Sequence, residues 1–135
     1  MASGLREAFY KSRMEDKSLS ARQRIAYMDS IIRLHPDDIE IRKLKSDLCW
    51  NTGDYMEAAS EYLMLAGRLD RKKQEHDALR AMAMAACSMQ LGNRPVEASN
   101  LALDIFRVEK SDSMSYYDLN AREVLINAAL MGNDV

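Results

Sequence analysis

The chain has 135 residues, which is enough for one domain with a substantial core, and we predict a single domain over residues 1–135. Apolar residues make up 47% and charged residues 30%, which excludes a disordered tail, and the five glycines and two prolines argue against collagen-like and all-β architectures. Nineteen basic and twenty-one acidic residues give a net charge of −2, which argues against nucleic acid as the main partner, because binding to phosphate backbones favours concentrated positive charge.

Signals for helix starts recur along the chain. Capping-box patterns begin at Ser20, Asp37 and Asp54, and a looser one begins at Ser115. In this pattern a short polar side chain accepts a hydrogen bond from the first N–H groups of a helix, and an acid or amide three residues later reaches back. Pro95 suits the first turn of a helix, where its missing N–H group costs nothing.

Three glycines, Gly53, Gly92 and Gly132, follow apolar stretches with helical spacing, as residues that adopt positive φ do at helix ends. They lie 39 and 40 residues apart (53 to 92, then 92 to 132), and each is followed by Asp or Asn. A fixed period of this size with two helices per unit is typical of helical solenoids. The predicted fold is therefore all-α, with about seven helices in antiparallel pairs. They cover residues 4–16, 20–34, 38–51, 55–70, 73–91, 95–109 and 115–131.

Two segments resemble a known family. Gly53-Asp-Tyr-Met-Glu-Ala-Ala59, followed by Tyr62, is similar to the turn and second helix of a tetratricopeptide (TPR) repeat. Ile32-Arg-Leu-His-Pro-Asp-Asp38 is similar to the end of the preceding repeat. The resemblance covers residues 20–135 and implies a right-handed superhelical stack of helix pairs. The period of 39–40 residues exceeds the usual 34 of this family, so other helical-hairpin solenoids stay open as alternatives.

The resemblance also implies a concave groove that is lined by the first helix of each pair. Counting back from each glycine predicts the lining residues as Lys43, Asp47 and Trp50 from one pair, Met82, Ala86 and Met89 from the next, and Arg122 and Ile126 from the third. The many methionines favour either close packing between helices or a soft surface that accepts varied ligands. The carboxylate clamp of some TPR proteins is not predicted, because Asp47 stands at an Asn position and the second pair offers Met and Ala.

No catalytic or metal-binding pattern is recognisable in the sequence. His35 lies at a predicted helix end, where the helix dipole explains it, and His76 lies in a charged, solvated stretch. Cys49 and Cys87 are 38 residues apart and lack the spacing of a zinc site, so we expect small buried hydrophobic residues in a reducing compartment. We therefore expect no enzyme, no metal and no cofactor.

The predicted function is the binding of another protein. We expect an adaptor, scaffold or chaperone-like module that takes a partner's peptide or helix in the concave groove. The alternative is a structural or oligomerisation segment of a larger regulatory or secretion protein, with self-association through the terminal helices. The chain ends at Val135, where a further partner helix is expected, so we expect a piece of a longer protein, with a seventh helix that caps the stack alone as the alternative. A secretory signal and a membrane-length apolar run are not recognisable, which predicts a cytoplasmic location without membrane insertion.

Overall fold

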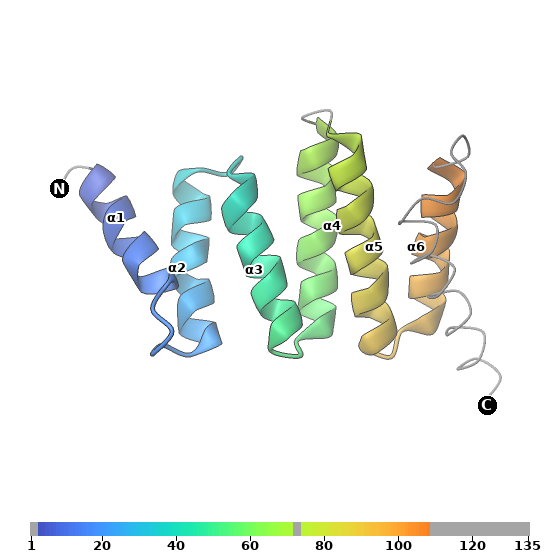
Figure 1. Ribbon diagram of the computed structural model, residues 1–135, viewed down its shortest axis with the longest axis horizontal. Coiled ribbons are helices and arrows are strands. Elements are labelled where there is room, and N and C mark those ends of the chain that lie inside the picture. Colours follow the sequence, from blue (N-terminus) through green and yellow to red (C-terminus); the bar gives the residue numbers. More distant parts are fainter. Residues whose placement is uncertain (1–2, 72–73, 109–135) are drawn as a thin grey trace.

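The computed structural model describes residues 3–71 and 74–108, and all of the regular structure within these residues is helical (Figure 1). The helices are α1 (Ser3–Met14), α2 (Ala21–Leu34), α3 (Ile39–Asn51), α4 (Tyr55–Arg71), α5 (Glu75–Leu91) and α6 (Pro95–Val108). These six helices confirm the all-α prediction and match the first six predicted ranges to within two residues at each end. The predicted seventh helix, over 115–131, lies outside the described residues.

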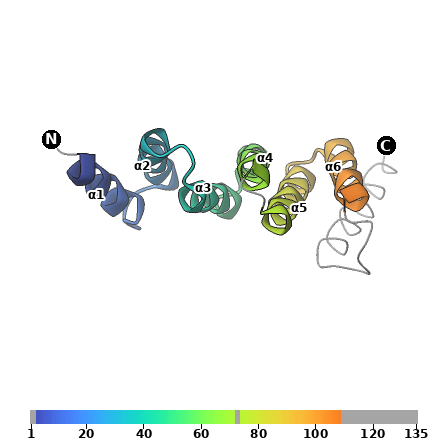
Figure 2. The ribbon, with the colours of Figure 1, turned by 90° about the horizontal axis from the view of Figure 1, so that it is seen from above.

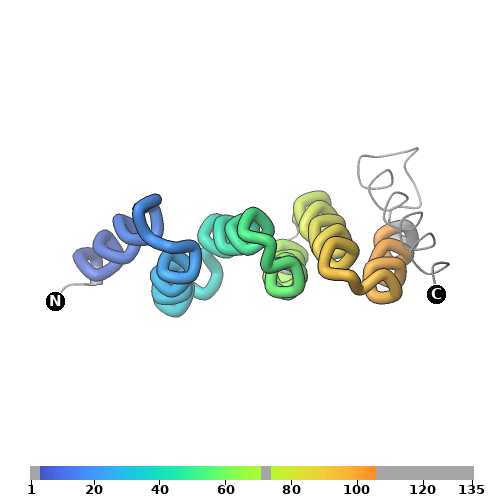
Figure 3. Tube along the Cα trace, turned by 90° about the horizontal axis from the view of Figure 1, so that it is seen from below, coloured from blue at the N-terminus to red at the C-terminus, as the bar shows by residue number. Residues whose placement is uncertain are grey.

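The helices stand side by side in a row that follows the order of the chain, and successive helices run in opposite directions (Figure 1). Viewed along the helices, the row zigzags, so that α1, α3 and α5 lie in one layer and α2, α4 and α6 lie in the other (Figures 2 and 3). The extensive contacts among the described helices join neighbours in the chain; the contact between α4 and α5 is the largest and that between α2 and α3 the smallest. Helices of the same layer are therefore separated by a space that the opposite layer closes on one side.

The turns after α3 and α5 have the same hydrogen bonds, 40 residues apart. After α3, the N–H groups of Gly53 and Asp54 donate to the carbonyl groups of Trp50 and Cys49, the pattern of a Schellman motif. After α5, Asn93 and Arg94 donate in the same way to Gln90 and Met89. Gly53 (φ 84°) and Asn93 (φ 63°) are the residues with left-handed backbones, whereas Gly92 has a φ of −81°. The structural counterpart of Gly53 is therefore Asn93, and the prediction that Gly92 supplies the positive φ is wrong.

Side-chain caps set the starts of α2 and α3. The predicted capping box at Ser20 is present: its hydroxyl accepts from the Gln23 N–H group, and the Gln23 side chain accepts from the Ser20 N–H group. The cap of α3 is Asp38, which accepts from the Ile41 N–H group at 3.2 Å. The prediction that placed this cap at Asp37 is therefore wrong by one residue, and Asp37 instead pairs with Arg68 of α4 at 2.9 Å.

Small side chains let α4 and α5 approach closely. Ala58, Ala59 and Ala66 of α4 are buried, as are five alanines of α5. They are Ala78, Ala81, Ala83, Ala85 and Ala86. Alanine loses no side-chain entropy on burial and leaves the two backbones room to meet, which explains the extensive contact between these helices. Larger side chains, among them Tyr62, Leu65 and Ile105, fill the spaces beside the alanines.

One cluster of charges ties three helices together. The Lys45 ammonium group of α3 lies 2.8 Å from Asp29 of α2 and 2.8 Å from Glu61 of α4. Burial by itself lowers the pKa of Lys45, but the hydrogen bonds to the two carboxylates outweigh it and hold the pKa above its ordinary value. This cluster links α3 to α2 and to α4, and it therefore reinforces the pair of neighbouring helices, α2 and α3, that shares the smallest contact.

Candidate functional site

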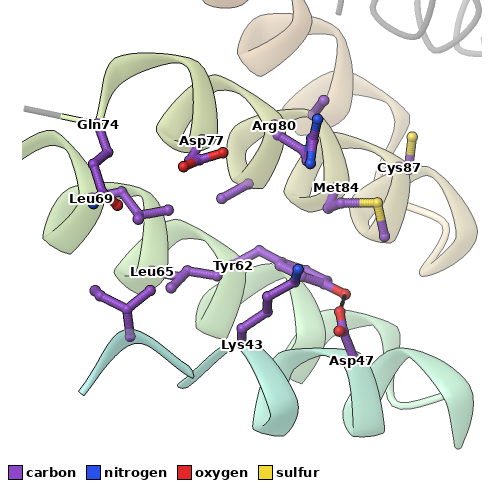
Figure 4. Close-up of a pocket in the computed structure, with 13 residues that line it drawn as sticks. Lys43, Asp47, Tyr62, Leu65, Leu69, Gln74, Asp77, Arg80, Met84 and Cys87 are labelled. Carbon is purple, nitrogen blue, oxygen red and sulfur yellow. Dashed lines mark hydrogen bonds between the residues drawn. The ribbon is translucent and has the colours of Figure 1, made fainter. Parts of the chain in front are cut away.

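A well-formed depression lies between α3 and α5, with α4 as its floor, and we refer to it as the α3–α5 groove (Figure 4). It has a volume of about 340 Å³. Its lining consists of Ile39, Lys43 and Asp47 of α3, Tyr62, Leu65 and Leu69 of α4, and Gln74, Asp77, Arg80, Ala81, Ala83, Met84 and Cys87 in and just before α5. It is the space that the zigzag of helices leaves between two members of the same layer.

The floor of the groove is apolar and fixed. Leu65 and Leu69 are 3% and 5% exposed, so they belong to the core and cannot swing away. Tyr62 is also buried, and its hydroxyl donates a hydrogen bond to the Asp47 carboxylate of α3. Burial, and then the hydrogen bond to the negative Asp47, raise the pKa of Tyr62 far above its ordinary value, so this hydroxyl stays a donor. The Tyr62–Asp47 bond joins the floor to one wall.

Charged side chains rise from both walls. Lys43 extends from α3 into the groove, and Asp77 and Arg80 come from α5 on the opposite side (Figure 4). All three are exposed. Within the described part of the chain, no ion pair is formed by Lys43 or by Arg80. The groove therefore combines a rigid apolar floor with solvated charges at its edges, which is how sites for peptides and small molecules are usually built.

Two of the predicted groove residues, Lys43 and Asp47, line the α3–α5 groove. Trp50 does not; it is half-buried, packs on the core and meets Tyr55 edge-on at 5.6 Å between ring centroids. The remaining predicted residues of the second pair, Met82, Ala86 and Met89, do not line it either. Ala86 and Met89 are buried in the core cluster that includes α6, and Met82 packs against that cluster. Arg122 and Ile126 lie outside the described residues.

The misplacement on α5 has a simple cause. The prediction counted back from Gly92, whereas the counterpart of Gly53 is Asn93. Moving Met82 and Ala86 forward by one residue gives Ala83 and Cys87, and both of these line the groove. One residue corresponds to a rotation of about 100° around a helix, which is enough to turn a groove position into a core position.

The sequence reasoning also missed the flank of α5 that faces α3. Asp77, Arg80, Met84 and Cys87 line this side of the groove. Their spacing of three, four and three residues places them on one helical face, and this mixed face of two charges and two sulfur-containing side chains was the available signal. A corrected count from the helix end finds Cys87 but not Asp77, Arg80 or Met84, because α3 and α5 face the groove with opposite flanks.

The described residues include several His, Cys, Asp and Glu side chains, the residue types that most often bind metal ions. No group of three or more His, Cys, Asp or Glu side chains within them is placed to hold a metal ion. Cys49 is fully buried, and burial together with the nearby Glu57 and Glu61 raises the pKa of its thiol to about 11. Such a thiol stays protonated and unreactive at neutral pH. A second, more open depression includes Glu7 and His35, whose side chains lie 3.0 Å apart.

Comparison with known proteins does not assign the chain to a family. No protein-family model matches it, and neither a curated protein sequence nor a solved structure is significantly similar to it. None of the helices in the described segments is both long enough and apolar enough to cross a membrane. The resemblance to TPR repeats thus remains a prediction, and the α3–α5 groove is the feature from which a function must be argued.

Proposed function

We propose that this chain is a protein-interaction module, an adaptor or scaffold of the TPR-like α-solenoid type, that binds a segment of a partner protein in the α3–α5 groove. The observation that carries this proposal is the groove itself: an apolar floor that belongs to the core, with charged side chains on both walls. Binding to such a pre-formed surface does not require the protein to become ordered at the same time, which reduces the entropic cost of association.

The size of the groove fits a peptide segment. Ile39 and Asp47, which mark its extent along α3, are eight residues apart, or about 12 Å along a helix at 1.5 Å per residue. About four residues of extended peptide, at about 3.3 Å each, or two turns of a helix span that distance. Met84 and Cys87 add polarisable sulfur atoms to one wall, and flexible thioethers adapt to side chains of different shape.

A selection from a displayed library of random twelve-residue peptides tests this proposal. Peptides enriched on the wild-type chain are expected to lose binding to Met84→Glu, which puts a charge on the wall of the groove. The matched control is Met64→Glu, because Met64 is half-exposed on α4 and does not line the groove. Circular dichroism of both variants checks the fold. Equal binding of the enriched peptides to wild type, Met84→Glu and Met64→Glu would place their site elsewhere and contradict the proposal.

The rate of thiol labelling tests the same proposal without a mutation. Cys87 lines the groove and is half-buried, whereas Cys49 is fully buried and has a raised pKa. We expect N-ethylmaleimide to label Cys87 in the wild-type protein and an enriched peptide to slow this labelling at least about fivefold, while Cys49 stays unlabelled in both cases. Peptide mass mapping separates the two thiols. Unchanged labelling of Cys87 under saturating peptide would contradict binding in the groove.

A further inference from the structure

The α3–α5 groove holds two cationic side chains on facing walls, Lys43 from α3 and Arg80 from α5 (Figure 4). Neither forms an ion pair with another described residue, although carboxylates are common in the chain. Other basic residues near this region are paired: Lys45 contacts Asp29 and Glu61, and Arg68 contacts Asp37. Among the described residues, the two basic side chains that line the groove, Lys43 and Arg80, thus border the same apolar floor without an ion pair.

The two acidic side chains that line the groove, Asp47 and Asp77, each have a stabilising interaction within the protein. Asp47 accepts the hydrogen bond of the buried Tyr62 hydroxyl, so part of its hydrogen-bonding capacity is used in joining α3 to α4. Asp77 lies in the first turn of α5, where the helix dipole stabilises a negative charge. Neither is within ion-pair distance of Lys43 or Arg80. The positive charge between the walls is therefore available to a ligand.

Apolar surface continues on both sides of these cations. Leu69 and Ile39 lie toward the N-terminal ends of α3 and α5, and Met84 lies toward their C-terminal ends. A ligand that ended at the cations would cover only one of these two apolar surfaces. From this arrangement we infer that the partner segment carries an internal Asp or Glu side chain, held between Lys43 and Arg80, with apolar residues on both sides of it. This inference rests on the proposed function and specifies the chemistry of its ligand.

The experiment uses a peptide enriched in the selection on the wild-type chain, synthesised with an amidated C-terminus so that it lacks a terminal carboxylate. The comparison peptide has the same sequence, except that its acidic residue is replaced by Gln or Asn. Binding is measured by fluorescence anisotropy at low and at physiological salt. The protein variants are Lys43→Glu/Arg80→Glu and, as a matched control of equal charge change, Lys17→Glu/Arg22→Glu, whose residues are exposed and outside the groove.

We expect the acidic peptide to bind wild type at least about tenfold more tightly than its amide version, because a charge-assisted hydrogen bond is about twice as strong as a neutral one. The groove double variant should lose at least this factor and prefer a peptide with Lys at the same position, while the control double variant should bind as wild type does. The preference should weaken as salt is added.

The outcomes separate this inference from the proposed function. Peptides that depend on Met84 but bind equally well with Gln in place of the acid would overturn the internal carboxylate and leave the groove as a binding site. Binding that requires a free C-terminus, and that amidation abolishes, would also overturn it. Enriched peptides that are indifferent to Met84→Glu would overturn both proposals together.

Discussion

At the scale of single residues, Gly53 and Gly67 show how the same residue type has opposite effects in two backbone settings. Gly53 has a φ of 84° in the turn after α3, and a Cβ atom there would meet no other atom within 4 Å. Gly67 lies inside α4 with helical φ, and a Cβ atom there would also meet nothing. Contact with the surrounding residues therefore plays no part at either position, and the local backbone conformation decides the effect of adding a methyl group.

We expect Gly53→Ala to lower the free energy of unfolding by about 1 kcal/mol, because an L-residue is strained at positive φ. Gly67→Ala should raise it by about 0.5–1 kcal/mol, because alanine loses less backbone entropy in a helix. Urea denaturation followed by circular dichroism measures both. Changes of the same sign in the two variants would contradict the assignment of the left-handed position to Gly53.

At the scale of elements, much of the helical pattern could be predicted because its signals are local. Ser20 caps α2, Pro95 begins α6 and apolar residues recur at helical spacing, so each boundary depends on a few neighbouring residues. The prediction of the groove residues depended on finer information than the prediction of the helices did. Gly92 satisfies the sequence signal for a left-handed residue, yet the backbone places Asn93 there, and the resulting shift of one residue exchanged core and groove positions on α5. The contribution of Leu65 and Leu69 requires knowing which helix closes the groove, and no local signal carries this.

The Lys45 cluster connects α2, α3 and α4, and its removal should loosen them. Lys45→Met leaves the Glu61 carboxylate, 11% exposed, without its cation, so we expect a loss of about 2 kcal/mol in the free energy of unfolding. Lys45→Met/Glu61→Gln should lose less than the single variant, because no buried charge then lacks a partner. Chemical denaturation of the two variants tests this. A double variant that is less stable than Lys45→Met would contradict the account.

The pH dependence of this cluster follows from the pKa of Lys45. Hydrogen bonds to Asp29 and Glu61 raise the pKa in the folded state above the ordinary value of 10.5. The folded state therefore binds the proton more tightly than the unfolded chain does. The stability that the Lys45 cluster contributes is fully present below pH 10.5, and it is lost as the pH rises through the pKa of Lys45 in the folded state. Lys45→Met should thus lower the free energy of unfolding by less at alkaline pH than at pH 7.

At the scale of the whole molecule, a row of helices whose extensive contacts join neighbours in the chain need not unfold as one unit. Among neighbouring helices of the described chain, α2 and α3 share the smallest contact and α4 and α5 the largest. In such linear arrangements, stability is close to a sum of local terms and interfaces between neighbours. The groove is built on α3, α4 and α5, so it lies on the best-packed part of the row and its shape does not depend on α1.

Hydrogen exchange under native conditions should therefore show two levels of protection, with the amides of α1 and α2 opening at a lower free energy than those of α4 and α5. Met28→Ala removes a side chain that is 3% exposed in the core between α1, α2 and α3, and we expect it to lower protection there by about 2 kcal/mol or more. Protection of α4 and α5 should change little. The counterpart Leu65→Ala, in the floor of the groove, should instead lower protection in α3, α4 and α5 together, because this side chain is packed in the cluster that joins them. Equal loss of protection along all helices in the Met28→Ala variant would show that the row unfolds as a single cooperative unit.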